Sequence, residues 1–150
     1  MAKKIFLNGF ENYDGIIEKI IIENDLKSIS IVVKQWNYDD THSLSELKFD
    51  GTIFQSLPEI SSFNLIDEII SEEETDAVIN QLNQYLKDNP NLNLSNTQDN
   101  IEQDIREAHK MKSFLLKAGY GSDWFIVSND MFLTETIKKN ADKLVKTDTK

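Results

Sequence analysis

The chain has 150 residues, of which 39% are apolar and 28% are charged, and these proportions are typical of one globular domain rather than of a disordered or membrane-embedded chain. The formal net charge is −10 and the isoelectric point is near 4.6, so a phosphate backbone would repel the protein and direct nucleic-acid binding is not expected. There are no cysteines, which excludes disulfides and thiolate metal ligands.

The apolar runs of the chain are short. The first apolar run consists of Ile5, Phe6 and Leu7 and ends at Asn8, so it is too short for the core of a signal peptide. No other apolar run approaches the length of a membrane span. Isoleucine, asparagine and lysine are abundant and arginine is scarce, as in proteins of AT-rich bacteria and their phages. We therefore expect a single domain over residues 1–150, located in the cytoplasm of a bacterial cell or infected host and without membrane contact.

The first expected elements are a strand over residues 4–8, a helix over 14–25 and a strand over 29–36. The helix is predicted because Ile16, Ile17, Ile20 and Ile21 recur at helical spacing after a possible N-cap at Asp14. The segment 29–36 is rich in β-branched residues. This order predicts a β-α-β start, with Trp36 at a strand end and in the core.

Asp50-Gly51 separates two alternating runs, 44–49 and 52–57, and predicts a β-hairpin, because a tight type I′ turn needs positive φ at both central residues. Leu47, Phe49, Ile53 and Leu57 would face the core. Residues 59–70 fit either a helix or a short strand through Phe63 and Leu65.

Ser71 and Glu74 form a capping-box pattern before a predicted helix over 72–87, whose apolar stripe is Val78, Ile79, Leu82, Tyr85 and Leu86. Pro90 should end it. Residues 88–100 are rich in Asn, Asp, Ser and Pro and predict a flexible loop. The remaining expected elements are a long helix over 98–118 and a strand over 123–128 that contains Trp124. They are followed by a helix through Leu133, Ile137, Ala141 and Leu144 and by a frayed tail over 146–150.

These elements predict an α+β or α/β fold. The expected architecture is a mixed sheet of about four to five strands, including the β-α-β start and the Asp50-Gly51 hairpin, packed against three to five helices.

The negative charge is concentrated in one third of the chain. Residues 59–107 contain twelve acids and two bases, whereas the remaining 101 residues contain fourteen of each. Many of these carboxylates occupy the first turns of predicted helices, where the helix dipole favours them. That placement explains their order but not their excess. The candidate partner-binding face is the acidic group on either side of the capping box, Asp67, Glu68, Glu72, Glu73, Glu74 and Asp76.

A second candidate site is the loop containing Asp39, Asp40 and His42, the only place where a histidine lies among carboxylates. Such a set could ligate a divalent metal, although the segment also reads as an ordinary polar connection. The sequence indicates no catalytic residues and no cofactor.

The composition favours a non-enzymatic acidic binding protein. Its expected partner is a basic surface on a nuclease or another nucleic-acid-binding protein, and the biological settings are a phage anti-defence or anti-CRISPR protein, an antirestriction-like nucleic-acid mimic, or a nuclease immunity protein. One alternative is a small metal- or ligand-dependent enzyme or binding module that uses the Asp39, Asp40 and His42 loop. Another is a structural subunit of a larger assembly.

Overall fold

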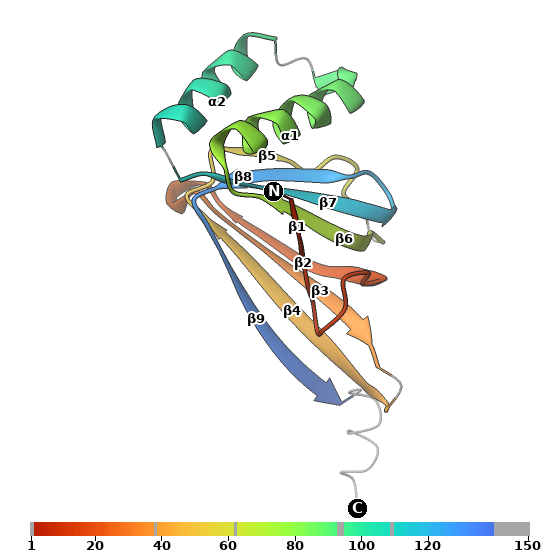
Figure 1. The fold of residues 1–150 in the computed structure, drawn as a ribbon. Coiled ribbons are helices and arrows are strands. Elements are labelled where there is room, and N and C mark those ends of the chain that lie inside the picture. The colour runs from red at the N-terminus through yellow and green to blue at the C-terminus, as the bar shows by residue number, and fades with distance from the viewer. Residues whose placement is uncertain (1, 38, 62, 93–94, 109, 140–150) are drawn as a thin grey trace, which may run out of the picture.

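The computed structural model describes residues 2–37, 39–61, 63–92, 95–108 and 110–139 (Figure 1). Within them lie nine strands, two α-helices and two short 3-10 helices. The strands are β1 (Lys3–Ile5), β2 (Gly15–Glu23), β3 (Ser28–Trp36), β4 (Thr41–Asp50), β5 (Phe54–Ser56), β6 (Leu65–Glu72), β7 (Lys112–Tyr120), β8 (Trp124–Ser128) and β9 (Asp130–Lys139). The helices are η1 (Asn24–Leu26), α1 (Thr75–Asp88), η2 (Pro90–Leu92) and α2 (Ser95–Ala108).

All described strand pairs are antiparallel. The strand order is β5-β8-β7-β6-β2-β3-β4-β9, and β1 pairs with β6 off this path. β6 and β2 share only the pairs Ile66 with Gly15 and Leu65 with Ile16. The sheet therefore divides into one half, β5-β8-β7-β6, and a second half, β2-β3-β4-β9, which diverge from this short junction (Figure 1).

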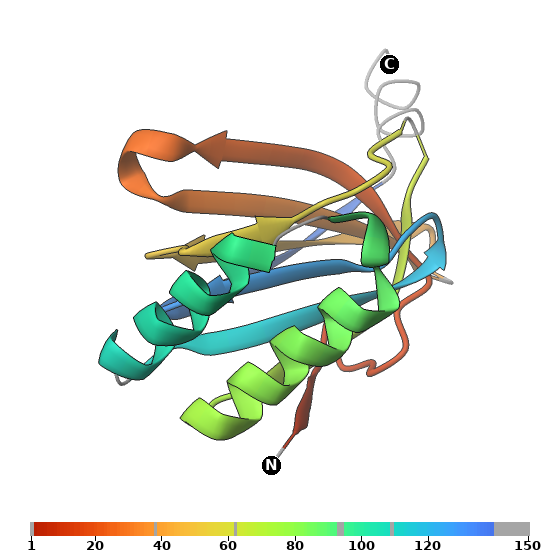
Figure 2. The same cartoon turned by 90° about the horizontal axis from the view of Figure 1, so that it is seen from above.

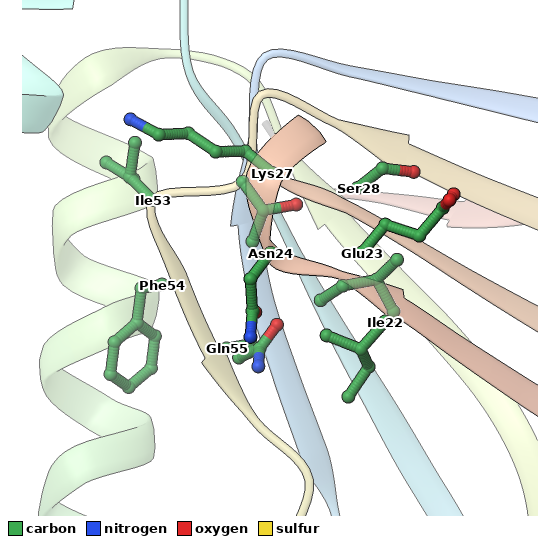
Figure 3. Close-up of a pocket in the computed structure, with 10 residues that line it drawn as sticks. Ile22, Glu23, Asn24, Lys27, Ser28, Ile53, Phe54 and Gln55 are labelled. Carbon is green, nitrogen blue, oxygen red and sulfur yellow. The ribbon is translucent and has the colours of Figure 1, made fainter.

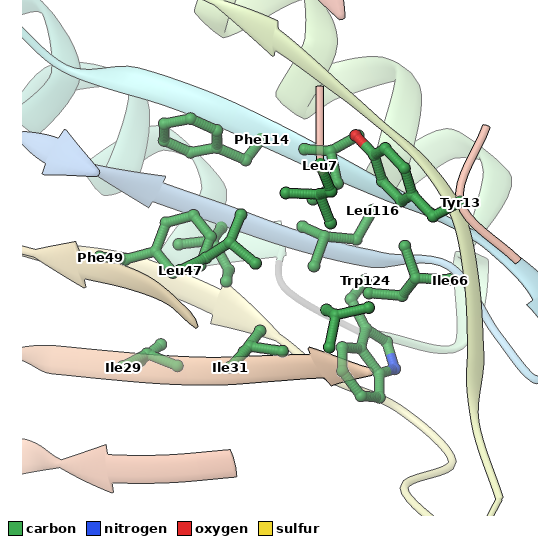
Figure 4. Packing of buried hydrophobic residues seen from close by; sticks show 13 residues of the cluster. Leu7, Tyr13, Ile29, Ile31, Leu47, Phe49, Ile66, Phe114, Leu116 and Trp124 are labelled. Carbon is green, nitrogen blue, oxygen red and sulfur yellow. The ribbon is translucent and has the colours of Figure 1, made fainter. Parts of the chain in front are cut away.

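The main core lies between the two halves of the sheet. β3 and β4 contribute Ile29, Ile31, Leu47 and Phe49 from one half, and β7 and β8 contribute Phe114, Leu116, Trp124 and Ile126 from the other. Phe49 and Phe114 meet edge to face with ring centroids 5.0 Å apart (Figure 4). Apolar contact across this space holds the halves together, since their shared backbone ladder is so short.

A second core joins the helices to the outer face of β5-β8-β7-β6 (Figure 2). Every residue of β8 is buried, because Trp124 and Ile126 point into the main core and Phe125 and Val127 point toward the helices. The helical side chains of this second core are Val78, Ile79, Leu82, Tyr85, Ile101 and Ile105.

The predicted α+β or α/β fold is wrong: the described chain is mainly antiparallel sheet with two α-helices, not a small mixed sheet under three to five helices. The β-α-β start fails because residues 15–23, within the predicted helix, form β2. β2 and β3 pair antiparallel and are joined by a short connection in which Lys27 has a left-handed backbone conformation. They are therefore not parallel strands linked by a crossover helix. The expected strand at 29–36 is confirmed as β3, whereas β1 overlaps the expected strand at 4–8 only at Lys4 and Ile5.

The predicted Asp50-Gly51 hairpin is also wrong. Gly51 has the expected positive φ of 66°, but β4 pairs with β3 and β9, and β5 pairs with β8. The chain after Gly51 is drawn away by other backbone bonds, since Thr52 N–H donates to the Lys27 carbonyl at 2.9 Å. The inward direction of Leu47 and Phe49 is confirmed, because both are fully buried.

The predicted helix over 72–87 is confirmed from Thr75 onward as α1, although Glu72 still belongs to β6, and the predicted strand over 123–128 is confirmed as β8. The ambiguous segment 59–70 contains the start of β6, and Ser71 belongs to that strand rather than to a capping box. The predicted helix over 98–118 is confirmed only as far as Ala108, where α2 ends, and its second part is wrong because β7 begins at Lys112. The helix through Leu133 and Ile137 is wrong because both lie on β9.

Most of the predicted flexible loop is helical in the structure. Of the predicted flexible loop 88–100, residues 90–92 form η2 and residues 95–100 belong to α2. The predicted tail 146–150 lies outside the described residues.

Candidate functional site

The six acids predicted as a partner-binding face lie along β6 and the start of α1. Asp67, Glu68 and Glu72 are on β6, Glu73 and Glu74 connect it to α1, and Asp76 is in the first turn of that helix. The strand residues are half-buried, whereas Glu73, Glu74 and Asp76 are exposed. The connection and the helix start therefore offer the more accessible charge.

Two of these acids are paired with lysines of β1. The antiparallel register places Lys3 opposite Ser71 and Lys4 opposite Ile70. Lys3 Nζ lies 2.8 Å from Glu73, and Lys4 Nζ lies 3.2 Å from Glu68 and 3.2 Å from Glu11. The hydrogen bond from Lys3 lowers the pKa of the Glu73 carboxyl, and those to Glu68 and Glu11 raise the pKa of Lys4. The N-terminal strand thus neutralises part of the acidic face.

The two α-helices run antiparallel, so the end of α2 lies beside the start of α1 (Figure 2). Arg106 Nη1 on α2 is 3.2 Å from Asp76 Oδ1 on α1, which is consistent with this alignment. The last turns of α2 therefore add Asp104 and Glu107, both exposed, to the acids of α1. We call this surface the acidic helical end, and its members are Glu73, Glu74, Asp76, Asp104 and Glu107.

Within the acidic helical end the ion pairs are unevenly distributed. Glu73 and Asp76 are paired with Lys3 and Arg106, whereas Glu74 and Asp104 form no ion pair with any described residue. Sequence reasoning missed the contribution of Asp104 and Glu107, since only the pairing of the helices places them near residues about 30 positions earlier. The two helices with the segment joining them, residues 75–108, carry six acids and two bases, and Glu72, Glu73 and Glu74 directly precede them.

The candidate metal residues Asp39, Asp40 and His42 lie at the connection between β3 and β4. The Asp39 carboxylate accepts a hydrogen bond from Thr41 Oγ1 at 2.6 Å. His42 is on β4, 9% exposed, and its ring meets that of Trp36 with centroids 5.6 Å apart. Among the residues that the structure describes, no group of three or more His, Asp or Glu side chains is arranged to hold a metal ion.

Trp36, predicted as a core residue, is 59% exposed, whereas Trp124 is buried as predicted. Lys34 Nζ lies 4.4 Å from the centre of a Trp36 ring, and His42 and Lys138 continue the same row across β4 and β9. The sequence does contain an indication that Trp36 is exposed: Lys34 lies two residues before it, and residues two apart share one face of a strand.

A shallow pocket opens where the β2 and β3 connection approaches β5 (Figure 3). Its volume is about 150 Å³, and its lining includes Ile22, Glu23, Lys27, Ile53 and Phe54. Drug-sized ligands occupy pockets of about 300 to 1,000 Å³, so this one is suited at most to a very small molecule.

No protein-family model, curated protein or solved structure matches the chain. None of the described helices is both long enough and apolar enough to cross a membrane.

Proposed function

We propose that this protein is a non-enzymatic binding protein whose acidic helical end engages a basic surface on a nucleic-acid-handling protein. The observation that carries the proposal is the antiparallel pairing of α1 and α2, because it gathers acids from two separate segments at one end of one layer. An inhibitor of a host defence nuclease, an antirestriction-like mimic or a nuclease immunity protein would use such a surface in the bacterial cytoplasm.

The two helices that carry most of these carboxylates are packed firmly on the sheet. α1 and α2 are anchored by Val78, Leu82 and Ile105, which are buried against Phe125 and Val127 of β8. A fixed array of negative charges can occupy a basic groove without a large ordering cost, and its field accelerates encounter with a basic partner.

The internal ion pairs reduce the charge available to a partner. Lys3 and Arg106 already contact Glu73 and Asp76, so Glu74, Asp104 and Glu107 are the acids best placed to contact a basic groove. Exposed ion pairs contribute only about 0 to 1 kcal/mol, so a partner's lysine or arginine could replace Lys3 or Arg106 at small cost.

The test is binding to an immobilised panel of basic bacterial nucleases at about 50 and about 200 mM salt. The acidic-end variant combines Glu74→Gln, Asp104→Asn and Glu107→Gln. The matched control combines Glu18→Gln, Glu23→Gln and Asp25→Asn, three exposed acids outside the helical layer, and changes the net charge equally. We expect salt-sensitive binding of the parent, a slower association rate for the acidic-end variant and little change for the control.

Two results would count against the proposal. The first is binding that does not weaken between the two salt concentrations. The second is an equal loss in both variants, because it would mean that total charge, and not the acidic helical end, governs association.

A further inference from the structure

β9 is a long edge strand. Its ten residues pair with β4 from Asp130 opposite Asp50 to Lys139 opposite Thr41, and its other edge pairs with no described strand (Figure 1). Nine of the ten side chains are exposed, and Met131 is half-buried. The opposite edge of the sheet, β5, has only three residues. Long open edges expose unpaired backbone N–H and C=O groups and are normally shortened or covered.

The exposed side chains of β9 are unusually apolar for an edge strand. Leu133 pairs with the buried Leu47 and therefore points to the inner face of the sheet, as do Met131 and Ile137. Leu133 is 37% exposed and Ile137 is 64% exposed, while Phe132, on the outer face, is 54% exposed. The inner face at β9 thus extends beyond the part that the other half of the sheet covers.

We propose that β9 pairs antiparallel with β9 of a second copy of this chain, with Thr134 opposite Thr134, so that two sheets join into one. The inference does not depend on the proposed function. Its basis is that β9 is complementary to itself, with Asp130 at one end and Lys138 at the other. A two-fold axis at Thr134 places Asp130 opposite Lys138 at both ends of the ladder.

The same register matches the apolar side chains. Met131 lies opposite Ile137 of the second copy on the inner face, and Phe132 lies opposite Thr136 on the outer face. Cross-strand pairs of this kind, together with the opposite charges, stabilise antiparallel ladders. Leu133 lies opposite Glu135, but the Glu135 carboxylate accepts hydrogen bonds from the Asn8 N–H and from Ser45 Oγ of its own chain. That carboxylate is therefore drawn away from the partner strand.

Neighbouring registers are less favourable. Residues that lie opposite each other in an antiparallel pair point to the same face of the sheet. With a two-fold axis perpendicular to the sheet, the two β9 strands can therefore shift only to registers in which inner-face residues remain opposite inner-face residues. Centring the axis on Glu135 places Met131 opposite Lys139 and removes the pair of Asp130 with Lys138. Centring it on Leu133 shortens the ladder and removes the Asp130 and Lys138 pair.

Sedimentation velocity of the full chain over a range of concentrations tests the proposal, with Asp130→Lys and Lys138→Asp as variants. Each variant alone places like charges at both ends of the ladder and should shift the dimer toward monomer. An equimolar mixture restores opposite charges in the heterodimer, so we expect the dimer to return in the mixture. The control Asp25→Lys makes the same charge change at an exposed residue of η1 and should leave dimerisation as in the parent.

Hydrogen exchange of the unsubstituted protein supplies a readout that needs no variant. β9 amides should become slower to exchange as the concentration rises through the dimerisation range, while those of the other edge strand, β5, should not change. A parent that stays monomeric at every concentration would overturn the proposal. So would a mixture no more dimeric than its two components.

Discussion

The contact between Phe49 and Phe114 gives a direct test of how the two halves of the sheet close over the core. Both rings are buried, on β4 and β7 respectively, and their centroids are 5.0 Å apart at an interplanar angle of 68°. Phe49→Leu and Phe114→Leu keep most of the apolar volume but remove the ring contact. Each single substitution should cost about 1 to 2 kcal/mol of unfolding free energy.

The double variant should lose less than the sum of the two single losses. An edge-to-face aromatic pair contributes about 0.5 to 1.5 kcal/mol beyond its buried area, and that coupling is counted in both single variants. The assay is urea unfolding followed by the fluorescence of the buried Trp124. The matched control combines Phe49→Leu with Phe125→Leu, because Phe125 is equally buried but faces the helices.

In the control the two losses should add to within about 0.5 kcal/mol. Additive losses for Phe49 and Phe114, or a coupling of Phe49 with Phe125 instead, would refute the arrangement in which β4 and β7 meet across one core.

Two further predictions concern backbone packing and ionisation. Gly15→Ala would place a methyl carbon 2.4 Å from Val33 Cγ1, so it should lower the unfolding free energy, measured in urea, by about 1 to 3 kcal/mol. The control Gly119→Ala makes only ordinary contacts and should change the unfolding free energy by less than about 1 kcal/mol. A Gly15→Ala variant more stable than the parent would contradict the β2 and β3 pairing. Burial raises the pKa of Tyr13 and of Tyr85 above the usual value near 10. The contribution of these two tyrosines to stability is therefore complete below about pH 10 and is lost as the pH rises toward the raised values. The unfolding free energy, measured as a function of pH, should fall in that range. Ultraviolet titration that showed both tyrosinates in the folded protein at pH about 10 would contradict this prediction.

The first predicted helix failed because a β-bulge imitates helical spacing. The register of β2 against β3 shifts between Ile17 and Lys19. This irregularity allows Ile17 and Ile20, three residues apart, to pack against the same core, although a regular strand would send them to opposite faces. Three-residue spacing of isoleucines therefore does not distinguish a helix from a bulged strand.

Spacing of four residues misled the prediction for β9 in a simpler way. Leu133 and Ile137 share a face in a helix, but four is also an even number, so they share a face in a strand as well. In β7, Phe114, Leu116 and Ala118 alternate as strand residues do, so the helical pattern that ends with α2 does not continue through this segment. By contrast, the α1 stripe of Val78, Ile79, Leu82 and Tyr85 fits no period of two, and that helix was predicted correctly.

The candidate site was predictable only where it depends on local chemistry. The sequence located the acids of α1 because carboxylates and helix starts lie together in the chain. It could not reveal that β1 lies beside β6, and so it missed the ion pairs of Lys3 and Lys4. The pairing of Arg106 with Asp76 spans 30 positions and likewise follows from the packing of two helices, not from any local pattern.

The two proposed surfaces lie at opposite ends of the molecule. The helices cover β5-β8-β7-β6, whereas β9 is the last strand of the other half (Figure 1). A chain with a net charge of −10 repels its own copies, and pairing through β9 keeps the two helical layers apart while bringing Asp130 against Lys138. The dimer would then present two acidic helical ends. A partner with two basic surfaces would bind such a dimer more tightly than a monomer, because the second contact becomes intramolecular.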